Sequence, residues 1–414
     1  LGGNWKASIK ATYLIARMEM LGASLRFTRV ADDVFTYNVG RYNYQHNQAS
    51  LNGRVSGSLN IFGREHEVAF GVSYRRHSRD DDGGWPSSYT EIFDANDWQG
   101  TTSPALPGIE YVWGRTGREI EYGGYASLRI NISDPLKILL GGRVSWYDYT
   151  NYLRSGTFRS NTHYRNSARI TPYVGITYDL DRYHSVYGSI TGIFNPQNYT
   201  SSKGDLLRPV EGTNYEMGVK GQYFDGLLNA SVALFQINQT NLPESLPLSE
   251  CSTGLACYAA AGEIRSRGVE AEISGNITKS WRIFAGYTYQ EAEYLEASVN
   301  GKAGDKYNTI IPRHLFTFST VYYLGDVLKN WRIGASARIQ SSIYNKISGY
   351  NPVRQNGVQI FNSMIGYNLS ENVDIQMNIT NIFDKKYYRA VSYPDNANLI
   401  GEPRSFLITA RLKI

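Results

Sequence analysis

The chain alternates apolar and polar side chains at every second position over much of its length. Near the C-terminus, Val373, Ile375 and Met377 are interleaved with Asp374 and Gln376. A period of two is typical of β-strands with one apolar and one polar face. Since no convincing amphipathic helix could cover these apolar faces, we expect lipid to cover them. The lipid-facing residues expected in this region are Val373, Ile375, Met377, Ile379, Phe406, Ile408 and Leu412.

This alternation predicts about sixteen strands, joined in turn by short and long connections. The expected short connections are 61–64, 133–135, 179–183, 224–226, 276–279, 325–330 and 370–372. The expected long connections are about 18–44, 78–118, 152–161, 195–211, 240–257, 292–306, 343–354 and 390–403. Short turns at one end and long loops at the other are typical of bacterial outer-membrane β-barrels, whose long loops lie outside the cell.

The composition agrees with an all-β, transmembrane antiparallel β-barrel that forms one domain over residues 1–414. The 414 residues include 33 Tyr and 40 Gly, which favour strands and turns. Mean hydropathy is −0.39, as expected where only alternate residues meet lipid. No apolar run approaches the roughly 18 to 20 residues of a membrane helix. A soluble β-propeller would show a blade-length repeat, and we find none.

The two cysteines and the net charge narrow the function classes. Cys251 and Cys257 lie close together in the stretch CSTGLAC, which predicts a disulfide; a metal-binding pair is the weaker alternative. The net charge of +5 is modest, and no basic stripe predicts nucleic-acid binding. The six histidines are scattered without zinc-ligand spacing, and no G-x-S-x-G or P-loop motif occurs. We therefore expect neither an enzyme nor a metal site.

The longest expected loop, 78–118, combines an acidic triplet with several aromatic residues. Asp80, Asp81 and Asp82 could bind a divalent cation through carboxylate oxygens, but a solvated loop tip is the expected reading. Exposed rings such as Trp85, Tyr89 and Trp113 need a partner, because large exposed apolar groups are otherwise unfavourable. That partner is either a ligand or the loop itself, and both interpretations stay open.

Several motifs, in this order, resemble one known family. They include IFGREHEVAFGVSY at 61–74, IFNPQN at 193–198, SRGVEAEISG at 266–275 and NITNIFDKKYY at 378–388. Together with the stretch from Asn214 to Asn241, they resemble TonB-dependent ferric-siderophore receptors. The similarity is greatest to the branch that takes hydroxamate siderophores such as coprogen and rhodotorulic acid, and extends to the related pyoverdine receptors.

The family pattern implies parts that this sequence does not show. Family members have a 22-stranded barrel preceded by a plug domain and a TonB box, whereas about sixteen strands and no plug are expected here. We therefore interpret the chain as strands seven to twenty-two of such a barrel. The family also usually ends in an aromatic residue, and Ile414 departs from that pattern.

The resemblance implies a monomeric TonB-dependent importer in the outer membrane of a Gram-negative bacterium. Its expected partners are a ferric siderophore, TonB through the N-terminal part, and outer-membrane lipid and lipopolysaccharide. Because the siderophore carries the iron, no cofactor or protein metal ligand is expected. A passive sixteen-stranded porin is the alternative function. The siderophore-contacting residues expected from the matching motifs and strand ends are Trp85, Tyr89, Phe194, Gln197, Asn198, Tyr344 and Tyr393.

Overall fold

The computed structural model describes residues 4–31, 34–89, 91–94, 105–252, 256–345, 351–392 and 398–413. Its strands are β1 (Lys6–Ala31), β2 (Val34–Ile61), β3 (Arg64–Gly84), β4 (Ile92–Asp94), β5 (Trp113–Asn131), β6 (Leu136–Ser155), β7 (Phe158–Asp179), β8 (His184–Asn195), β9 (Val210–Tyr223), β10 (Leu228–Thr240), β11 (Pro243–Ser245), β12 (Tyr258–Ala260), β13 (Ile264–Thr278), β14 (Trp281–Tyr294), β15 (His314–Tyr323), β16 (Trp331–Gln340), β17 (Ile343–Asn345), β18 (Val353–Gln355), β19 (Val358–Asn368), β20 (Val373–Thr380), β21 (Tyr388–Ala390), β22 (Leu399–Ile400) and β23 (Ser405–Leu412). Two short 3₁₀ helices, η1 (Leu248–Glu250) and η2 (Asp326–Leu328), interrupt the connections. None of the helices in these ranges is long and apolar enough to cross a membrane.

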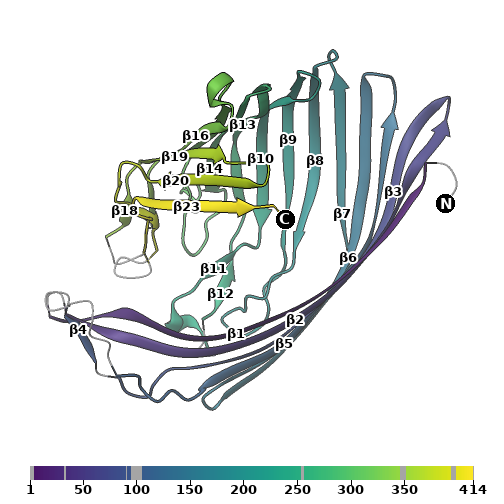
Figure 1. The fold of residues 1–414 in the computed structure, drawn as a ribbon. Coiled ribbons are helices and arrows are strands. Elements are labelled where there is room, and N and C mark those ends of the chain that lie inside the picture. Colours follow the sequence, from purple (N-terminus) through teal and green to yellow (C-terminus); the bar gives the residue numbers. More distant parts are fainter. Residues whose placement is uncertain are drawn as a thin grey trace.

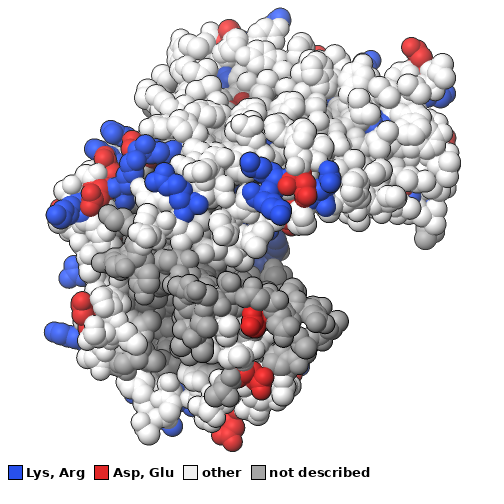
Figure 2. Space-filling view, turned by 90° about the vertical axis from the view of Figure 1, so that its left-hand side faces the viewer, with Lys and Arg blue, Asp and Glu red and all other residues white. Residues whose placement is uncertain are grey.

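The long strands form one curved antiparallel sheet in which sequential neighbours pair (Figure 1). Against an expectation of about sixteen strands, this sheet contains 17 strands within the described ranges, of which β4 has 3 residues. The remaining short strands form the hairpins β11–β12, β17–β18 and β21–β22. No pairing joins β1 to β23 among the described residues. Within the described ranges the sheet is therefore an open wall, and the space-filling view shows a deep notch in the molecule (Figure 2).

The short connections lie where the alternation predicted them. β2 turns into β3 through Phe62 and Gly63, with φ of 53° and 72°. Positive φ at both central residues gives the twist that a two-residue hairpin requires. The other predicted short connections likewise separate β5 from β6, β7 from β8, β9 from β10, β13 from β14, β15 from β16 and β19 from β20.

Three of the expected long loops are wrong in whole or in part, because strands run through them. β1 and β2 pair up to Arg26 opposite Thr36 and again at Ala31 opposite Val34, so residues 18–31 and 34–44 lie in strands rather than in a loop. β6 and β7 pair up to Ser155 opposite Phe158, which removes most of the loop expected at 152–161. β3 continues to Gly84, and Gly83 pairs with Trp113 at the start of β5. The 28 residues of β2 span about 90 Å, whereas the apolar band of a membrane barrel is about 25 Å tall. β2 therefore extends well beyond the apolar band.

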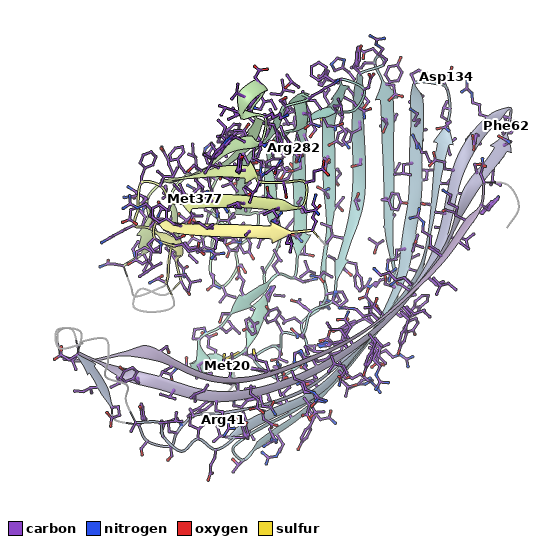
Figure 3. All side chains as sticks on the ribbon, in the orientation of Figure 1. Met20, Arg41, Phe62, Asp134, Arg282 and Met377 are labelled. Carbon is purple, nitrogen blue, oxygen red and sulfur yellow. A yellow bond between two sulfur atoms is a disulfide. The ribbon has the colours of Figure 1, made fainter. Side chains whose placement is uncertain are left out.

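The strand register separates an apolar outer face from a polar inner face. Met377 lies opposite Ile408 and Ile379 opposite Phe406, so the expected lipid-facing residues of β20 and β23 share one face. On the other face Arg332 donates to Asp374, with Nη1···Oδ2 at 2.6 Å. Arg332 reaches across Gly366, where an added Cβ would lie 2.5 Å from its guanidinium carbon. The uninterrupted alternation places Met20 on the concave face and Arg41 on the convex face, as Figure 3 shows.

The predicted disulfide is confirmed. The Sγ atoms of Cys251 and Cys257 lie 2.02 Å apart, and their Cα atoms 5.7 Å apart. The bond closes a small loop between η1 and β12, within the long connection from β10 to β13. It therefore braces the long-loop end of the sheet, on the side opposite the short turns.

Candidate functional site

Above the apolar band, the inner face of β2, β3, β5 and β6 carries a dense group of aromatic and charged side chains. The outer face is mainly polar beyond Leu51, Tyr74, Tyr122 and Trp146, with Ile120 and Tyr152 as exceptions, which marks the upper edge of the band. The inner positions beyond that edge alternate strictly along each strand, which brings their side chains onto one surface. We call this group the inner-wall cluster: Tyr42, Tyr44, His46, His77, Arg79, Asp81, Trp113, Arg115, Glu119, Tyr147 and Tyr149.

Asp81 is the centre of the charged part of this cluster. Its side chain is fully buried, and its Oδ1 lies 2.8 Å from His46 Nε2. Arg115 donates to Oδ2 from Nε at 3.1 Å and from Nη2 at 2.6 Å. The expectation that the acidic triplet is a solvated loop tip is therefore wrong. Residues 80–82 lie within β3, where alternation turns Asp81 inward and its two neighbours outward.

A second buried contact lies two residues along the same strand. Arg79 donates from Nη2 to the Tyr149 hydroxyl oxygen at 2.8 Å and lies 3.4 Å from Glu119 Oε1. Gly117 makes room for it, because an added Cβ would lie 2.8 Å from Arg79 Nε. That Nε is buried and has no hydrogen-bond partner among the described residues. Arg79 Nε is therefore a hydrogen-bond donor of the inner wall that has no acceptor among the described residues.

The rings of the cluster lie close together. Tyr42 and Tyr44 are stacked with centroids 6.1 Å apart, and Trp113 lies 6.5 Å from Tyr42. Tyr147 and Tyr149 are also stacked, at 6.4 Å. Burial raises the pKa of the Tyr149 phenol, so this ring is neutral under physiological conditions. Such rings offer apolar faces to a ligand beside fixed positive charges.

His77 lies beside one group of each charged contact, His46 and Glu119, and interacts electrostatically with both. Its ring lies 5.1 Å from that of His46, and its Nδ1 is 3.9 Å from Glu119 Oε2. Partial burial lowers the pKa of His77, although Glu119 opposes that shift. The imidazole therefore favours its neutral form at neutral pH and can accept as well as donate a hydrogen bond.

Tyr344 lies in a separate cavity of about 430 Å³ on the other half of the wall. The inner-face residues Ser266 and Gln290 line it together with segments that follow β14 and β16. Arg354 stacks over Tyr344, with its guanidinium carbon 5.2 Å from the ring centroid. Lys306, Tyr307 and Arg313 also line this cavity. Glu291 lines it as well and forms an ion pair with Arg313. The expected contact residue Tyr344 thus lies among cationic and aromatic groups and one acidic group, of which the cations suit an oxygen-rich anion.

The other expected contact residues are not gathered in one place. Trp85 follows β3 directly and is 50% exposed, whereas the Tyr89 hydroxyl donates to Ala105 O at 2.9 Å. Tyr89 therefore has a partner within its own loop. Trp85 is the freer of the two rings.

The IFNPQN motif is largely structural in its contacts. Gln197 is buried and donates from Nε2 to Arg208 O, in its own connection between β8 and β9, and to Asn241 O at 2.9 Å, in the connection after β10. Phe194 shares a strand face with Ile190, which lies on the outer face. Asn198 is exposed beside them. Tyr393, the last expected contact residue, lies outside the described residues.

No residue of the inner-wall cluster was in the expected contact set, although Trp113 and Asp81 were noted as residues of the expected loop 78–118. A signal was present: Tyr42, Tyr44 and His46, then His77, Arg79 and Asp81, recur at every second position. Their alternation is aromatic and charged rather than apolar, so it resembled loop composition. Within the described ranges, no group of three or more His, Cys, Asp or Glu side chains is arranged to hold a metal ion.

Comparisons with known proteins give the arrangement a family context. Residues 1–382 match the family model described as TonB dependent receptor-like, beta-barrel. The ferripyoverdine receptor of Pseudomonas aeruginosa is 32% identical over 385 residues, which cover 90% of this chain and 45% of that protein. The ferric-pyoverdine M114 receptor of Pseudomonas sp. strain M114 is 31% identical over 388 residues, covering 89% of this chain and 46% of that protein.

Solved structures agree with the sequence relatives. The crystal structure of the ferripyoverdine receptor of the P. aeruginosa outer membrane bound to ferripyoverdine superposes with a TM-score of 0.85 and 28% identity, covering 99% of this chain and 54% of that chain. A complex of the receptor FpvAI with pyocin S2 gives a TM-score of 0.84 at 28% identity, covering 99% and 52%. The chain thus spans about half the length of the relatives it matches.

Proposed function

Since the chain belongs to the TonB-dependent receptor family, whose members are β-barrel proteins of the Gram-negative outer membrane, we propose that the whole protein imports a ferric siderophore. In this proposal, the chelate binds in the bowl formed by the long-loop end of the wall. TonB then supplies the energy for import through the part of the receptor that precedes the barrel strands.

The observation that carries the proposal is the inner-wall cluster. Its stacked rings and guanidinium groups face the concave side above the apolar band, where a ligand arriving from outside the cell would enter. A ferric siderophore presents oxygen atoms around the iron and an organic backbone, which suit cations and rings respectively. The Tyr344 cavity offers the same chemistry across the bowl.

The chemical type of siderophore is a finer proposal. The sequence motifs favour a hydroxamate chelate, whereas the relatives reported above are named for ferric pyoverdine. Binding of purified full-length receptor to a ferric hydroxamate and to a ferric pyoverdine, compared side by side, tests this choice. Tighter binding of the pyoverdine would reject the hydroxamate assignment while leaving siderophore import intact.

Uptake should depend completely on energy coupling. Cells that carry the whole gene should accumulate iron-labelled siderophore, and deletion of TonB or collapse of the proton gradient should reduce uptake to background. A porin would instead admit solutes without energy and would conduct ions in planar bilayers. Energy-independent uptake with such conductance would reject the importer in favour of the porin.

Loss of inner-wall rings should weaken siderophore binding. We expect Tyr44→Ala combined with Trp113→Ala to lower affinity at least several-fold, because an aromatic contact contributes about 0.5 to 1.5 kcal/mol beyond its buried area. The measurement is fluorescence quenching of full-length receptor titrated with ferric siderophore.

The matched control is Tyr152→Ala, which removes a ring from the outer face of β6 and should leave affinity unchanged. Trp85→Ala and Tyr89→Ala test the loop contacts expected from sequence. If these two weaken binding while the Tyr44 and Trp113 variant does not, the ligand lies in the loop and not on the inner wall.

A further inference from the structure

Two histidines that are far apart in the sequence meet in the inner-wall cluster. His46 lies on β2 and His77 on β3, and their ring centroids are 5.1 Å apart, with the rings inclined at 68°. The charge of an imidazole changes between about pH 5 and pH 8, because its ordinary pKa lies in this range. The charge of this part of the wall therefore depends on the pH of the solution that fills the bowl.

The other charges at the centre of the cluster balance one another. Arg115 donates twice to Asp81, and Arg79 lies 3.4 Å from Glu119. One guanidinium group thus accompanies each carboxylate. While the imidazoles are neutral, the centre of the cluster carries no net charge, and protonation of an imidazole makes it positive.

The charged surroundings of His77 come from the strands on both sides of it. His77 pairs with Gln48 on β2 and with Glu119 on β5. On β1, Leu14 lies opposite Gln48, and Ala16 lies opposite His46, so β1 places no titratable group there. The titratable and charged groups on the same face are Tyr44 and His46 on β2, Arg75, Arg79 and Asp81 on β3, Arg115, Glu119 and Glu121 on β5, and Arg143, Tyr147 and Tyr149 on β6.

These surroundings keep His77 neutral until the solution becomes acidic. Partial burial lowers the pKa of His77, and His46, Arg79 and Arg75 lower it further, whereas Glu119 raises it. The imidazole therefore gains its proton below the ordinary range of a histidine. An anion bound beside it would favour the protonated form and raise the pKa again.

Protonation also changes which groups the two carboxylates hold. Asp81 lies between His46 and Arg115, and Glu119 lies between His77, at 3.9 Å, and Arg79. A protonated imidazole competes with the guanidinium group for the shared carboxylate, because opposite charges at this distance attract. The guanidinium N–H groups then become available to oxygen anions in the bowl. Arg79 Nε already has no acceptor among the described residues.

We propose that His77, together with His46, forms a pH-sensitive pair that strengthens binding of the oxygen anions of a ferric chelate when the medium outside the cell becomes acidic. Proton and anion favour the same charge state of the cluster, so each strengthens binding of the other. This inference rests on the proposed function and adds a regulation of the same site. The inner wall thus has a neutral form with weaker affinity and a positive form with stronger affinity.

The test measures affinity as a function of pH. Full-length receptor in detergent is titrated with ferric pyoverdine and with ferric coprogen, by fluorescence quenching, between about pH 5.5 and pH 8. We expect the chelate that binds to do so about tenfold more tightly at the acidic end, since a ligand that raises one pKa by one unit changes its affinity by that factor.

Two variants fix the charge at position 77. His77→Gln removes the titrating group, so its affinities at the two ends of the pH range should agree. His77→Lys introduces a lasting positive charge, so its affinity at the alkaline end should approach that of the wild type at the acidic end. The matched control is His163→Gln on the outer face, where His163 lies 3.7 Å from Asp148 and is 60% exposed. This control should keep the pH dependence of the wild type, and heat-modifiable migration in gels confirms that each variant barrel has assembled.

Several outcomes would overturn the pair as a pH-sensitive device. Affinity of the wild type that does not change with pH would reject it while leaving siderophore import intact. An acidic increase that persists in His77→Gln, or disappears in His163→Gln, would assign the titrating group to another place. Weak binding by His77→Lys at every pH would show that positive charge at this position does not strengthen binding. Failure of both chelates to bind at any pH would reject the proposed function itself, and this inference with it.

Discussion

Replacing Met377 with arginine should lower the stability of the assembled barrel by about 2 to 4 kcal/mol, the cost of a cation near the bilayer midplane. Met377 lies at the middle of β20, opposite Ile365 on one side and Ile408 on the other, on the apolar outer face. An arginine there would face acyl chains. The loss is measured as the shift in the free energy of unfolding of full-length receptor in lipid vesicles.

The adjacent residue provides the control. Asn378 is turned to the polar inner face, where its Oδ1 accepts from Gln376 at 2.9 Å, so Asn378→Arg should be mild. Gln376 is less suitable, because its Oε1 accepts from Arg332 at 3.0 Å and a new cation there would meet a like charge. Equal losses at 377 and 378 would refute the assignment of inner and outer faces.

Asp81→Asn should destabilise the upper part of the wall by about 3 kcal/mol. Removing one partner of a buried ion pair leaves the other charge uncompensated, which typically costs 3–5 kcal/mol. The lower end of this range applies because Arg115 and His46 each keep 35% side-chain exposure. We expect faster amide hydrogen exchange along residues 79–83 and 113–117, together with weaker siderophore binding.

Asp80→Asn is the matched control within the same acidic triplet. Asp80 is exposed on the outer face and accepts one hydrogen bond from Thr116, so the exchange of the same amides should hardly change. If both variants lose protection against amide hydrogen exchange to the same extent, the three aspartates 80–82 act through their total charge. The central role assigned to buried Asp81 would then be wrong.

The sequence by itself determined the features that depend on neighbouring residues in the chain. The period-2 alternation predicted the all-β architecture, because each residue of a strand faces the opposite way from the next. Turn residues such as Phe62 and Gly63 placed the short connections, since hairpin geometry is local. The spacing of Cys251 and Cys257 predicted their bond for the same reason.

Only the tertiary structure decided how far the strands rise above the membrane and which side chains meet there. Once a strand leaves lipid, its outer face becomes polar, so the apolar alternation that predicts a strand disappears while backbone pairing continues. Residues 18–31, 34–44 and 80–82 therefore resembled loops although they lie in strands. The contacts of Asp81 with His46 and of Arg79 with Tyr149 join positions 35 and 70 residues apart. Such contacts are set by the pairing of strands and not by any local pattern.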